Sequence, residues 1–514
     1  MGKSGLKVDS VLAMIDHGPF VGRGTKMSRL KEAYACVQAG QSWIMSIKGE
    51  SGIGKTRMAT EFLGWAAAHG ADVLQGRAFE AGGRWPFQPL IAMLEWRRTR
   101  GMSELQEPCT LFDPRNEMLD RVLIEMRTYI CDQFSDEAKY KHLFESFTLL
   151  GQTLAEQAPV VMFIDDIHWS DFASLALLQY ASRRWIESNT PLFILLSLRT
   201  EALVMLPTFA AWLAHIERDS HSASFILNPL TLEDTTNFVL ALAAEETVQL
   251  EGFGRWLYTE TGGQAFYIIE LLKMLFEHEL LRAYERKEGE WEIDFEPVVG
   301  NTDVLEAMVL PGVRAVIAMR LKHLSPSARM LIAAGAVLGR NLPFAYICCV
   351  ANLAEKEGWE ALNELLERCI FCEEAAYYFF THDKVREVAY AETTESQRVE
   401  LHTRALETLH IEIVPVSFQA YHAQAAGLHE QAFSLYITAG DAMLRLFAFH
   451  DAISFYESAL HLVLVQQVEV GACTAFEHAS QIVYALAERI EDEQVRAKFL
   501  TAPQVQRVMT HIIG

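Results

Sequence analysis

The stretch GESGIGKT at residues 49–56 decides the fold of this chain. It fits the pattern G-x-x-x-x-G-K-[ST] without a mismatch, between an apolar run at 43–47 and a helix-like stretch at 56–68. A strand, a glycine-rich loop and a helix in this order favour phosphate binding, because glycines let successive N–H groups face the phosphates and the helix N-terminus adds positive potential. Lys55 is then expected to reach the β- and γ-phosphates, and Thr56 to ligate Mg²⁺.

A second motif, VVMFIDD at residues 160–166, ends an apolar run in two acids. Asp165 is expected to hold the magnesium shell, and Asp166 to orient or deprotonate an attacking water. The alternative is a glycine-rich structural turn, but a second strand that ends in an acidic pair makes coincidence improbable. Together the motifs predict a nucleoside-triphosphate site.

Strand-like runs recur along the first part of the chain and alternate with stretches that can form helices. The runs cover residues 43–48, 71–77, 160–167, 191–199 and 224–230. This alternation predicts a three-layer parallel α/β domain, and both motifs fall at strand C-terminal ends, where such sheets bind nucleotides.

The strand signal fades after residue 230, and four domains are predicted. A P-loop NTPase domain covers 1–230, a small helical domain 231–300, a winged-helix domain 301–395 and a helical region 396–514. The helical domain is expected to have helices over 231–281 and then a short strand in a loop at 288–295. In the winged-helix domain, Ser325-Pro326 separates two amphipathic helices, and residues 377–380 resemble a strand.

The C-terminal region contains a short internal repeat. Two trios of residues share the spacing i, i+4, i+7 and the order small–large–small: Ala432, Tyr436 and Ala439, then Ala452, Tyr456 and Ala459. Such faces suit tetratricopeptide-like helical hairpins, and an amphipathic bundle without repeats is the alternative. Because a repeat array needs about three units and a cap, the chain is expected to be a fragment of a longer protein.

Composition narrows the classes further. The chain has 514 residues and a formal net charge of −23, which argues against broad contact with phosphate backbones. Without an apolar run long enough for a membrane span, a cytoplasmic protein with reduced thiols is expected. The group Cys348, Cys349, Cys369 and Cys372 contains one CxxC, so a zinc site stands against core cysteines as the alternative.

With these motifs placed, the chain resembles the signal-transduction ATPases with numerous domains, the STAND class of P-loop ATPases. The branch it is most similar to serves LuxR-type and antibiotic-regulatory transcription activators and some adenylate cyclases. The motifs that carry the resemblance are FVGR at 20–23, GESGIGKTR at 49–57, GRWPFQPL at 83–90, FIDDIHWSD at 163–171, LLSLRTE at 195–201, TGGQAFYIIELL at 261–272, LPGVRAVIAMRLKHLSPSARMLIAAGAVLGR at 310–340 and FTHDKVREVAY at 380–390.

The resemblance implies roles for individual residues. Arg199 would sense the γ-phosphate, His382 would contact the ADP β-phosphate, and residues 231–300 would form a helical lid. The residues assigned to nucleotide binding are Phe20, Val21, Gly22, Arg23, Gly49, Glu50, Ser51, Gly52, Ile53, Gly54, Lys55, Thr56, Arg57, Arg199 and His382. Lys55, Asp166 and Arg199 are the catalytic candidates, and Thr56 and Asp165 the metal ligands. The cofactors would be ATP or ADP with Mg²⁺.

Several positions have a second interpretation or depart from the family pattern. Arg199 is alternatively a charge in a structural ion pair, and His382 alternatively only an N-cap. Gly24 follows the entry arginine where the family has glutamate, and Ala265 replaces a proline that touches the base. These departures bear on base specificity and ADP retention.

The resemblance implies a switch with slow ATP hydrolysis, controlled by an inducer on the C-terminal helices and self-associating when ATP-bound. We expect a transcriptional output through a DNA-binding domain outside this chain, and no membrane contact. Two alternatives remain open: the same ATPase attached to a nucleotide cyclase or protein kinase, or a DNA-loading initiator-type ATPase, against which the negative charge counts.

Overall fold

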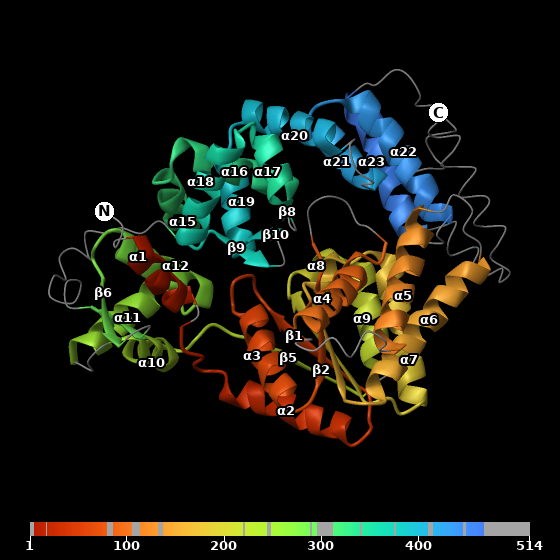
Figure 1. Cartoon of the computed structure of the whole chain (residues 1–514), viewed down its shortest axis with the longest axis horizontal. Helices are drawn as coiled ribbons and strands as arrows, with labels where there is room; N and C mark the ends of the chain where they lie inside the picture. The colour runs from red at the N-terminus through yellow and green to blue at the C-terminus, as the bar shows by residue number, and fades with distance from the viewer. Residues whose placement is uncertain are drawn as a thin grey trace.

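The computed structural model describes most of the chain and arranges its elements in four groups, the first of which contains a parallel sheet (Figure 1). The described residues are 5–16, 18–79, 86–104, 114–131, 137–218, 221–243, 248–287, 290–295, 312–339, 342–374, 377–409, 415–445 and 449–466. The end of the predicted helical region, 467–514, and part of the 83–90 motif lie outside them.

A five-stranded parallel sheet forms the first domain, in the order β2-β3-β4-β1-β5. Its strands are β1 (Trp43–Gly49), β2 (Asp72–Arg77), β3 (Val160–Asp165), β4 (Leu192–Arg199) and β5 (Ser222–Ile226). The prediction of five parallel strands is confirmed. The C-terminal ends of β1, β2, β3 and β4 meet at one edge, in register Gly49↔Arg199 and Arg77↔Asp165.

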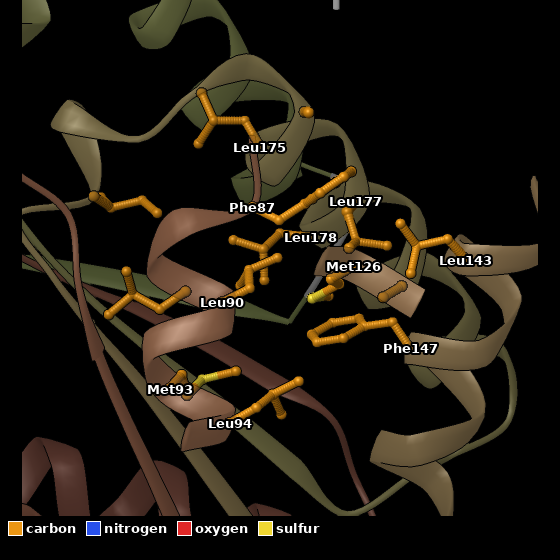
Figure 2. Packing of buried hydrophobic residues seen from close by; sticks show 14 of the residues in the cluster. Phe87, Leu90, Met93, Leu94, Met126, Leu143, Phe147, Leu175, Leu177 and Leu178 are labelled. Carbon is orange, nitrogen blue, oxygen red and sulfur yellow. The ribbon is translucent and has the colours of Figure 1, made fainter. Parts of the chain in front are cut away.

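Helices cover both faces of the sheet. One face carries α2 (Gly24–Gln38) and α3 (Lys55–Ala68). The other face carries α4 (Gln88–Glu104), α5 (Pro114–Cys131), α6 (Glu137–Ala155), α7 (Phe172–Glu187) and α9 (Pro207–Arg218). The short helix α8 (Ala202–Met205) precedes α9. Alternate residues of β3 enter the two cores, Val161 and Phe163 on one side and Met162 on the other. Figure 2 shows the second core, where Phe87, just before α4, packs with Met93 of α4 and Phe147 of α6.

Two strand predictions extend too far. The run at 160–167 ends as a strand at Asp165, and Ile167–Trp169 forms a 3₁₀ turn because Asp166 takes the left-handed conformation (φ 52°, ψ 41°). The run at 224–230 is a strand only to Ile226, but it begins earlier, at Ser222. After Ile226 the backbone turns toward the next unit, where Leu230 donates to the Gly263 carbonyl.

A small helical unit follows, made of α10 (Leu232–Leu242), α11 (Val248–Thr261) and α12 (Ala265–Glu277). The predicted short strand at 288–295 is present as β7 (Glu290–Asp294). It pairs antiparallel with β6 (Arg282–Lys287), a strand that was not predicted. The sequence RAYERK of β6 is mostly charged and gives no alternating apolar signal. Helix α1 (Gly5–Asp16) packs on this unit, with Val11 and Ile15 in its core.

The next unit, called here the α15–α20 unit, contains helices and a small antiparallel sheet. Its helices are α15 (Val313–Lys322), α16 (Pro326–Leu338), α17 (Phe344–Ala351), α18 (Glu355–Glu367), α19 (Asp383–Glu392) and α20 (Glu395–Leu409), and its sheet has the order β8-β10-β9, from β8 (Leu342–Pro343), β9 (Phe371–Glu374) and β10 (Tyr377–Phe380). Ser325 caps α16 through its side chain, with Pro326 in the first turn, so the predicted helix break is confirmed.

A buried ion network joins the small helical unit to the α15–α20 unit. Arg320 of α15, 3% exposed, donates to Glu270 at 2.6 Å and to Glu277 at 3.0 Å, both on α12. Lys273, beside them on α12, contacts Glu270 at 3.6 Å and Asp16 of α1 at 2.5 Å. These opposite charges compensate one another, which a buried charge requires. The pairs therefore tie α1, α12 and α15 together.

The C-terminal helices are α21 (Val416–Ala425), α22 (His429–Arg445) and α23 (Phe449–Gln466). All six residues of the repeated trios are buried. The tyrosines bind the preceding helix: Tyr436 donates to Gln424 and Tyr456 to Asp441, each at 2.6 Å. Helices α22 and α23 share a hydrophobic core with the sheet domain, and Figure 1 shows them running toward its helices.

Asp451 of α23 makes a polar contact across that packing. Its carboxylate accepts from the Phe172 N–H, the first of α7, at 3.0 Å. Asp171 already caps α7 by accepting from Ser174 N, so Asp451 satisfies a second N–H of the same helix end. The C-terminal helices thus contact the helix that starts after the acidic pair.

We expect Asp451→Ala to loosen the first turn of α7 by about 1 kcal/mol, the usual effect of losing an N-terminal cap. Hydrogen exchange of the amides at residues 172–174 should then be about fivefold faster. Ser454→Ala, on an exposed position of the same helix, is the control. Equal exchange in both variants would show that the contact contributes nothing.

The four cysteines of the predicted group differ in burial, and Cys369 is half-buried. Cys348 is buried and its thiol faces the Leu353 carbonyl, whereas Cys349 and Cys372 are exposed. Among the described residues, no group of three or more His, Cys, Asp or Glu side chains is placed to hold a metal ion. In that same part of the chain, every helix is too short or too polar to cross a membrane.

Candidate nucleotide-binding site

The glycine-rich loop connects β1 to α3 at the C-terminal edge of the sheet. Gly52 (φ 79°) and Gly54 (φ 98°) lie in the left-handed region, which favours glycine. A side chain at Gly52 would also meet Phe266 at 3.0 Å, and Phe266 N donates to the Gly52 carbonyl at 3.0 Å. The small helical unit therefore closes directly over this loop.

Lys55 is the first residue of α3 and is buried, with 6% exposure. Its ammonium donates to the carbonyls of Gly49 at 3.0 Å and Glu50 at 2.8 Å, so its side chain curls back along the loop. Burial lowers the pKa of Lys55, while Asp166 and Asp165 oppose that shift. A cation held inside the loop in this way is placed to meet phosphate charge.

The acidic pair is held by contacts with two elements, α3 and β4. Asp165 accepts from the Thr56 hydroxyl at 2.9 Å and from the Ser197 hydroxyl of β4, and Ser197 in turn accepts from Asp166 N at 2.8 Å. Asp166 is a non-glycine residue in the left-handed region, a conformation that concentrates at functional sites. Sequence reasoning missed Ser197, although β4 was predicted, because the register that sets it beside Asp165 is tertiary.

Thr56 and Asp165, the predicted metal ligands, lie next to each other, and their oxygens are of the kind that Mg²⁺ prefers. The residues present therefore fit a magnesium ion coordinated by one carboxylate and one hydroxyl, with the remaining positions left to phosphate oxygens and water.

Arg77, at the end of β2, is a further residue that the sequence reasoning did not select. Its guanidinium lies 3.2 Å from Asp165 and 3.5 Å from Asp166. It also lies 3.6 Å from Asp383 of α19. The sequence held part of this information, because Arg77 ends the strand predicted at 71–77. The pairing of that strand with β3 comes only from the structure.

The entry motif at residues 20–23 contacts the backbone of the glycine-rich loop through Arg23. Arg23 is buried and donates to the Ile53 carbonyl of the loop at 3.2 Å and to the Asn228 carbonyl after β5 at 2.8 Å. Burial lowers its pKa. Phe20 packs on the core of the sheet domain and Val21 on that of the small helical unit. The motif therefore joins the two units, with Gly22 (φ 70°) making the turn.

Other loop residues point in different directions. Glu50 accepts from Gln264 of the small helical unit at 3.3 Å. Arg57, assigned to the nucleotide, contacts the Gly18 carbonyl at 3.1 Å and Glu61 at 2.7 Å, one turn further along α3. Ile53 is buried under the loop, whereas Ser51 is partly exposed in the turn.

Arg199 ends β4 at the same edge and faces α19. Its guanidinium lies 3.4 Å from Asp383 and 4.0 Å from Glu387. The ion-pair interpretation of Arg199 is thus observed, and its partners belong to the α15–α20 unit. Since Asp383 also faces Arg77, one carboxylate bridges two arginines at the ends of β2 and β4.

His382 precedes α19 and makes two contacts. Its Nδ1 accepts from Lys384 N at 3.0 Å, so it is the N-cap of α19, as the alternative interpretation held. Its ring also stacks on Phe266, with centroids 3.8 Å apart. An unprotonated Nδ1 leaves the proton of a neutral ring on Nε2, which can then donate elsewhere. Capping and phosphate contact are therefore compatible roles.

Comparison with known proteins agrees with the sheet domain. Residues 19–195 match the family model of the AAA ATPase domain. An uncharacterized protein of Rhizobium meliloti (strain 1021) is 23% identical over an alignment of 476 residues, which covers 87% of this chain and 43% of that protein. The chain thus spans less than half the length of that relative.

Two solved structures are among those to which the chain is similar. The first is a STAND protein with a tetratricopeptide repeat sensor from Pyrococcus horikoshii, with 14% identity and a TM-score of 0.46 over 97% of this chain and 66% of that one. The second is a Walker-type ATPase of Pyrococcus abyssi, with 14% identity and a TM-score of 0.36 over 72% of this chain and 96% of that one. The family match over 19–195 confirms the predicted P-loop ATPase domain.

Proposed function

We propose that this chain is a nucleotide-dependent signal-transduction switch of the STAND class and the regulatory ATPase part of a transcriptional regulator. The observation that carries the proposal is the docking of one helix start, His382-Asp383, on both the Arg199 side chain of the sheet domain and Phe266 above the glycine-rich loop. The order of the motifs and the AAA ATPase domain at 19–195 support it.

The four groups of elements suit the four parts of such a switch. The small helical unit, which contacts the loop through Phe266 and Gln264, serves as the lid. The α15–α20 unit, whose helices accompany a small antiparallel sheet, serves as the winged helix. Helices α21 to α23 serve as part of a tetratricopeptide-like sensor.

In the proposed resting state, the loop and Lys55 hold the ADP phosphates while His382 donates to the β-phosphate from above. Asp383 keeps Arg199 paired, so α19 and a γ-phosphate compete for one guanidinium. In the ATP-bound state, Asp166 orients a water molecule and accepts its proton during slow hydrolysis, which returns the switch to the resting state. A magnesium ion on Thr56 and Asp165 would supply electrostatic stabilisation of the phosphate charge.

Opening requires more than a change of nucleotide. Shifting a two-state equilibrium from 1:99 to 99:1 takes about 5.5 kcal/mol of differential binding. The contacts that ATP weakens are a few ion pairs and one stacked ring, so an inducer on the C-terminal helices is proposed as a second input. Asp451 offers a path for it, because it joins α23 to the start of α7. The opened form would self-associate through its ATPase domains.

The identity of the co-purifying nucleotide tests the proposal, together with the mass of the protein in solution with ADP and with ATP. We expect bound ADP and a monomer in the first case, and a larger assembly with ATP and inducer in the second. A preparation that neither retains nor binds adenine nucleotides would overturn the proposal. The output domain is identified by the coding sequence on either side of this segment.

The negative charge of the chain supports placing DNA contact elsewhere. A salt-dependent DNA-binding assay on this chain checks that part. Tight binding whose affinity falls steeply with salt would instead favour an initiator-type ATPase.

We call the proposed contact of His382 with the ADP β-phosphate the clamp. We expect His382→Ala to weaken the binding of ADP more than the binding of ATP, by about 1.5–3 kcal/mol, the range for a hydrogen bond to a charged group. The ratio of ADP to ATP dissociation constants, measured by calorimetric titration, should therefore shift toward ATP by about tenfold or more. By linkage, the same variant should populate the open form without an inducer.

His382→Asn separates the two roles of this residue, because asparagine is a good N-cap but has no ring to stack on Phe266. We expect it to shift the ratio as the alanine variant does while keeping α19 stable. The exposed His323 provides a matched control as His323→Ala. An unchanged ratio in both His382 variants would discard the clamp.

A further inference from the structure

The side chain of Arg77 lies between three carboxylates from two separate parts of the chain. They are Asp165 at the end of β3, Asp166 in the turn after it, and Asp383 at the start of α19, at 3.2, 3.5 and 3.6 Å. Arg77 itself is about one-third exposed, so the guanidinium can leave this position without unpacking a core.

The contact with Asp165 involves the oxygen that matters for the metal. Asp165 Oδ2 accepts from the Thr56 hydroxyl at 2.9 Å and faces Arg77 Nε at 3.2 Å. Thr56 and Asp165 are the residues that fit a magnesium ion. Two cations cannot share one carboxylate oxygen without repulsion, so the guanidinium and a divalent ion compete for Asp165.

The other end of the guanidinium reaches the α15–α20 unit. Arg77 and Arg199 both face the same oxygen of Asp383, at 3.6 and 3.4 Å. Each guanidinium contributes positive charge beside this carboxylate. Drawing Arg77 away from the acidic pair therefore removes part of the positive charge that holds Asp383 at the sheet edge.

We propose that Arg77 is a positioning residue that couples the metal site to the docking of α19: metal binding at Asp165 displaces its guanidinium and so loosens Asp383. This inference rests on the proposed function, because it takes Thr56 and Asp165 to be the metal site of a nucleotide-binding protein. By linkage the coupling is reciprocal, so docked α19 also weakens metal binding.

The test compares ADP binding with and without Mg²⁺ in the full chain, by calorimetric titration. In Arg77→Gln the competitor for Asp165 is gone, so the gain in ADP affinity on adding Mg²⁺ should be about tenfold larger than in the unmodified protein. Arg77→Lys, which keeps the charge, should stay close to the unmodified protein. The matched control is Arg97→Gln, because Arg97 pairs with Asp72 at 2.8 Å at the opposite end of β2. It should change nothing.

The hydrogen-exchange rate of residues 383–392 is a second measurement. If Arg77 had only a structural role, Mg²⁺ would not change this rate. In the unmodified ADP complex, Mg²⁺ should speed exchange at the start of α19, and in Arg77→Gln it should have no effect. Equal Mg²⁺ gains in the Gln variant and the unmodified protein would overturn the inference, and so would exchange in the unmodified protein that ignores Mg²⁺. If the unmodified protein fails to bind ADP at all, the proposed function itself is wrong, which is a distinguishable outcome.

Discussion

Lys55→Ala is expected to abolish nucleotide binding. The ammonium of Lys55 lies inside the loop, where it donates to the carbonyls of Gly49 and Glu50, and where the β- and γ-phosphates are expected to bind. A charge-assisted hydrogen bond contributes about 1.5–3 kcal/mol, so losing two phosphate contacts costs about 3–6 kcal/mol. Calorimetric titration should show ADP and ATP affinities lower by at least about a hundredfold.

Lys48→Ala is the matched control for that experiment. Lys48 is also mostly buried and lies on β1, but it pairs with Glu217 at 3.1 Å, away from the loop. The control should bind nucleotide normally. Unchanged ATP affinity in Lys55→Ala would show that the loop does not bind phosphates.

Asp166→Asn should suppress ATP turnover by about 10²- to 10⁴-fold, the contribution usual for a general base, while ADP and ATP bind within about threefold of normal. Asparagine is the conservative replacement here, because Asp166 has a φ of 52° and asparagine tolerates the left-handed conformation. The amide also keeps the shape of the carboxylate beside Arg77. Steady-state phosphate release checks the rate.

Asp165→Asn provides the contrast. Asp165 lies against Thr56 and is the proposed metal ligand, so its loss should weaken Mg²⁺-dependent nucleotide binding. The two neighbouring carboxylates should therefore fail in different ways. Equal loss of binding in both variants would remove this division of labour and leave Asp166 without an assigned proton transfer.

Local features could be predicted from the sequence because they depend on neighbours along the chain. The strand, loop and helix around residues 43–68 follow from apolar runs and glycine spacing, and Asp171 and Ser325 cap helices that begin at the next residue. β6 was missed for the same reason: its charged residues give no local signal, and pairing with β7 alone makes it a strand.

The relations between distant segments were decided by the tertiary structure. Strand order and register bring Ser197 and Arg77 to Asp165, and no periodicity in the sequence encodes that register. Docking of the α15–α20 unit places Asp383 on Arg199 and His382 on Phe266. The sequence by itself determined that this chain carries a phosphate-binding loop and an acidic pair. Which charges surround them depended on packing between units far apart in the chain, because such contacts form only when several separate surfaces fit together at once.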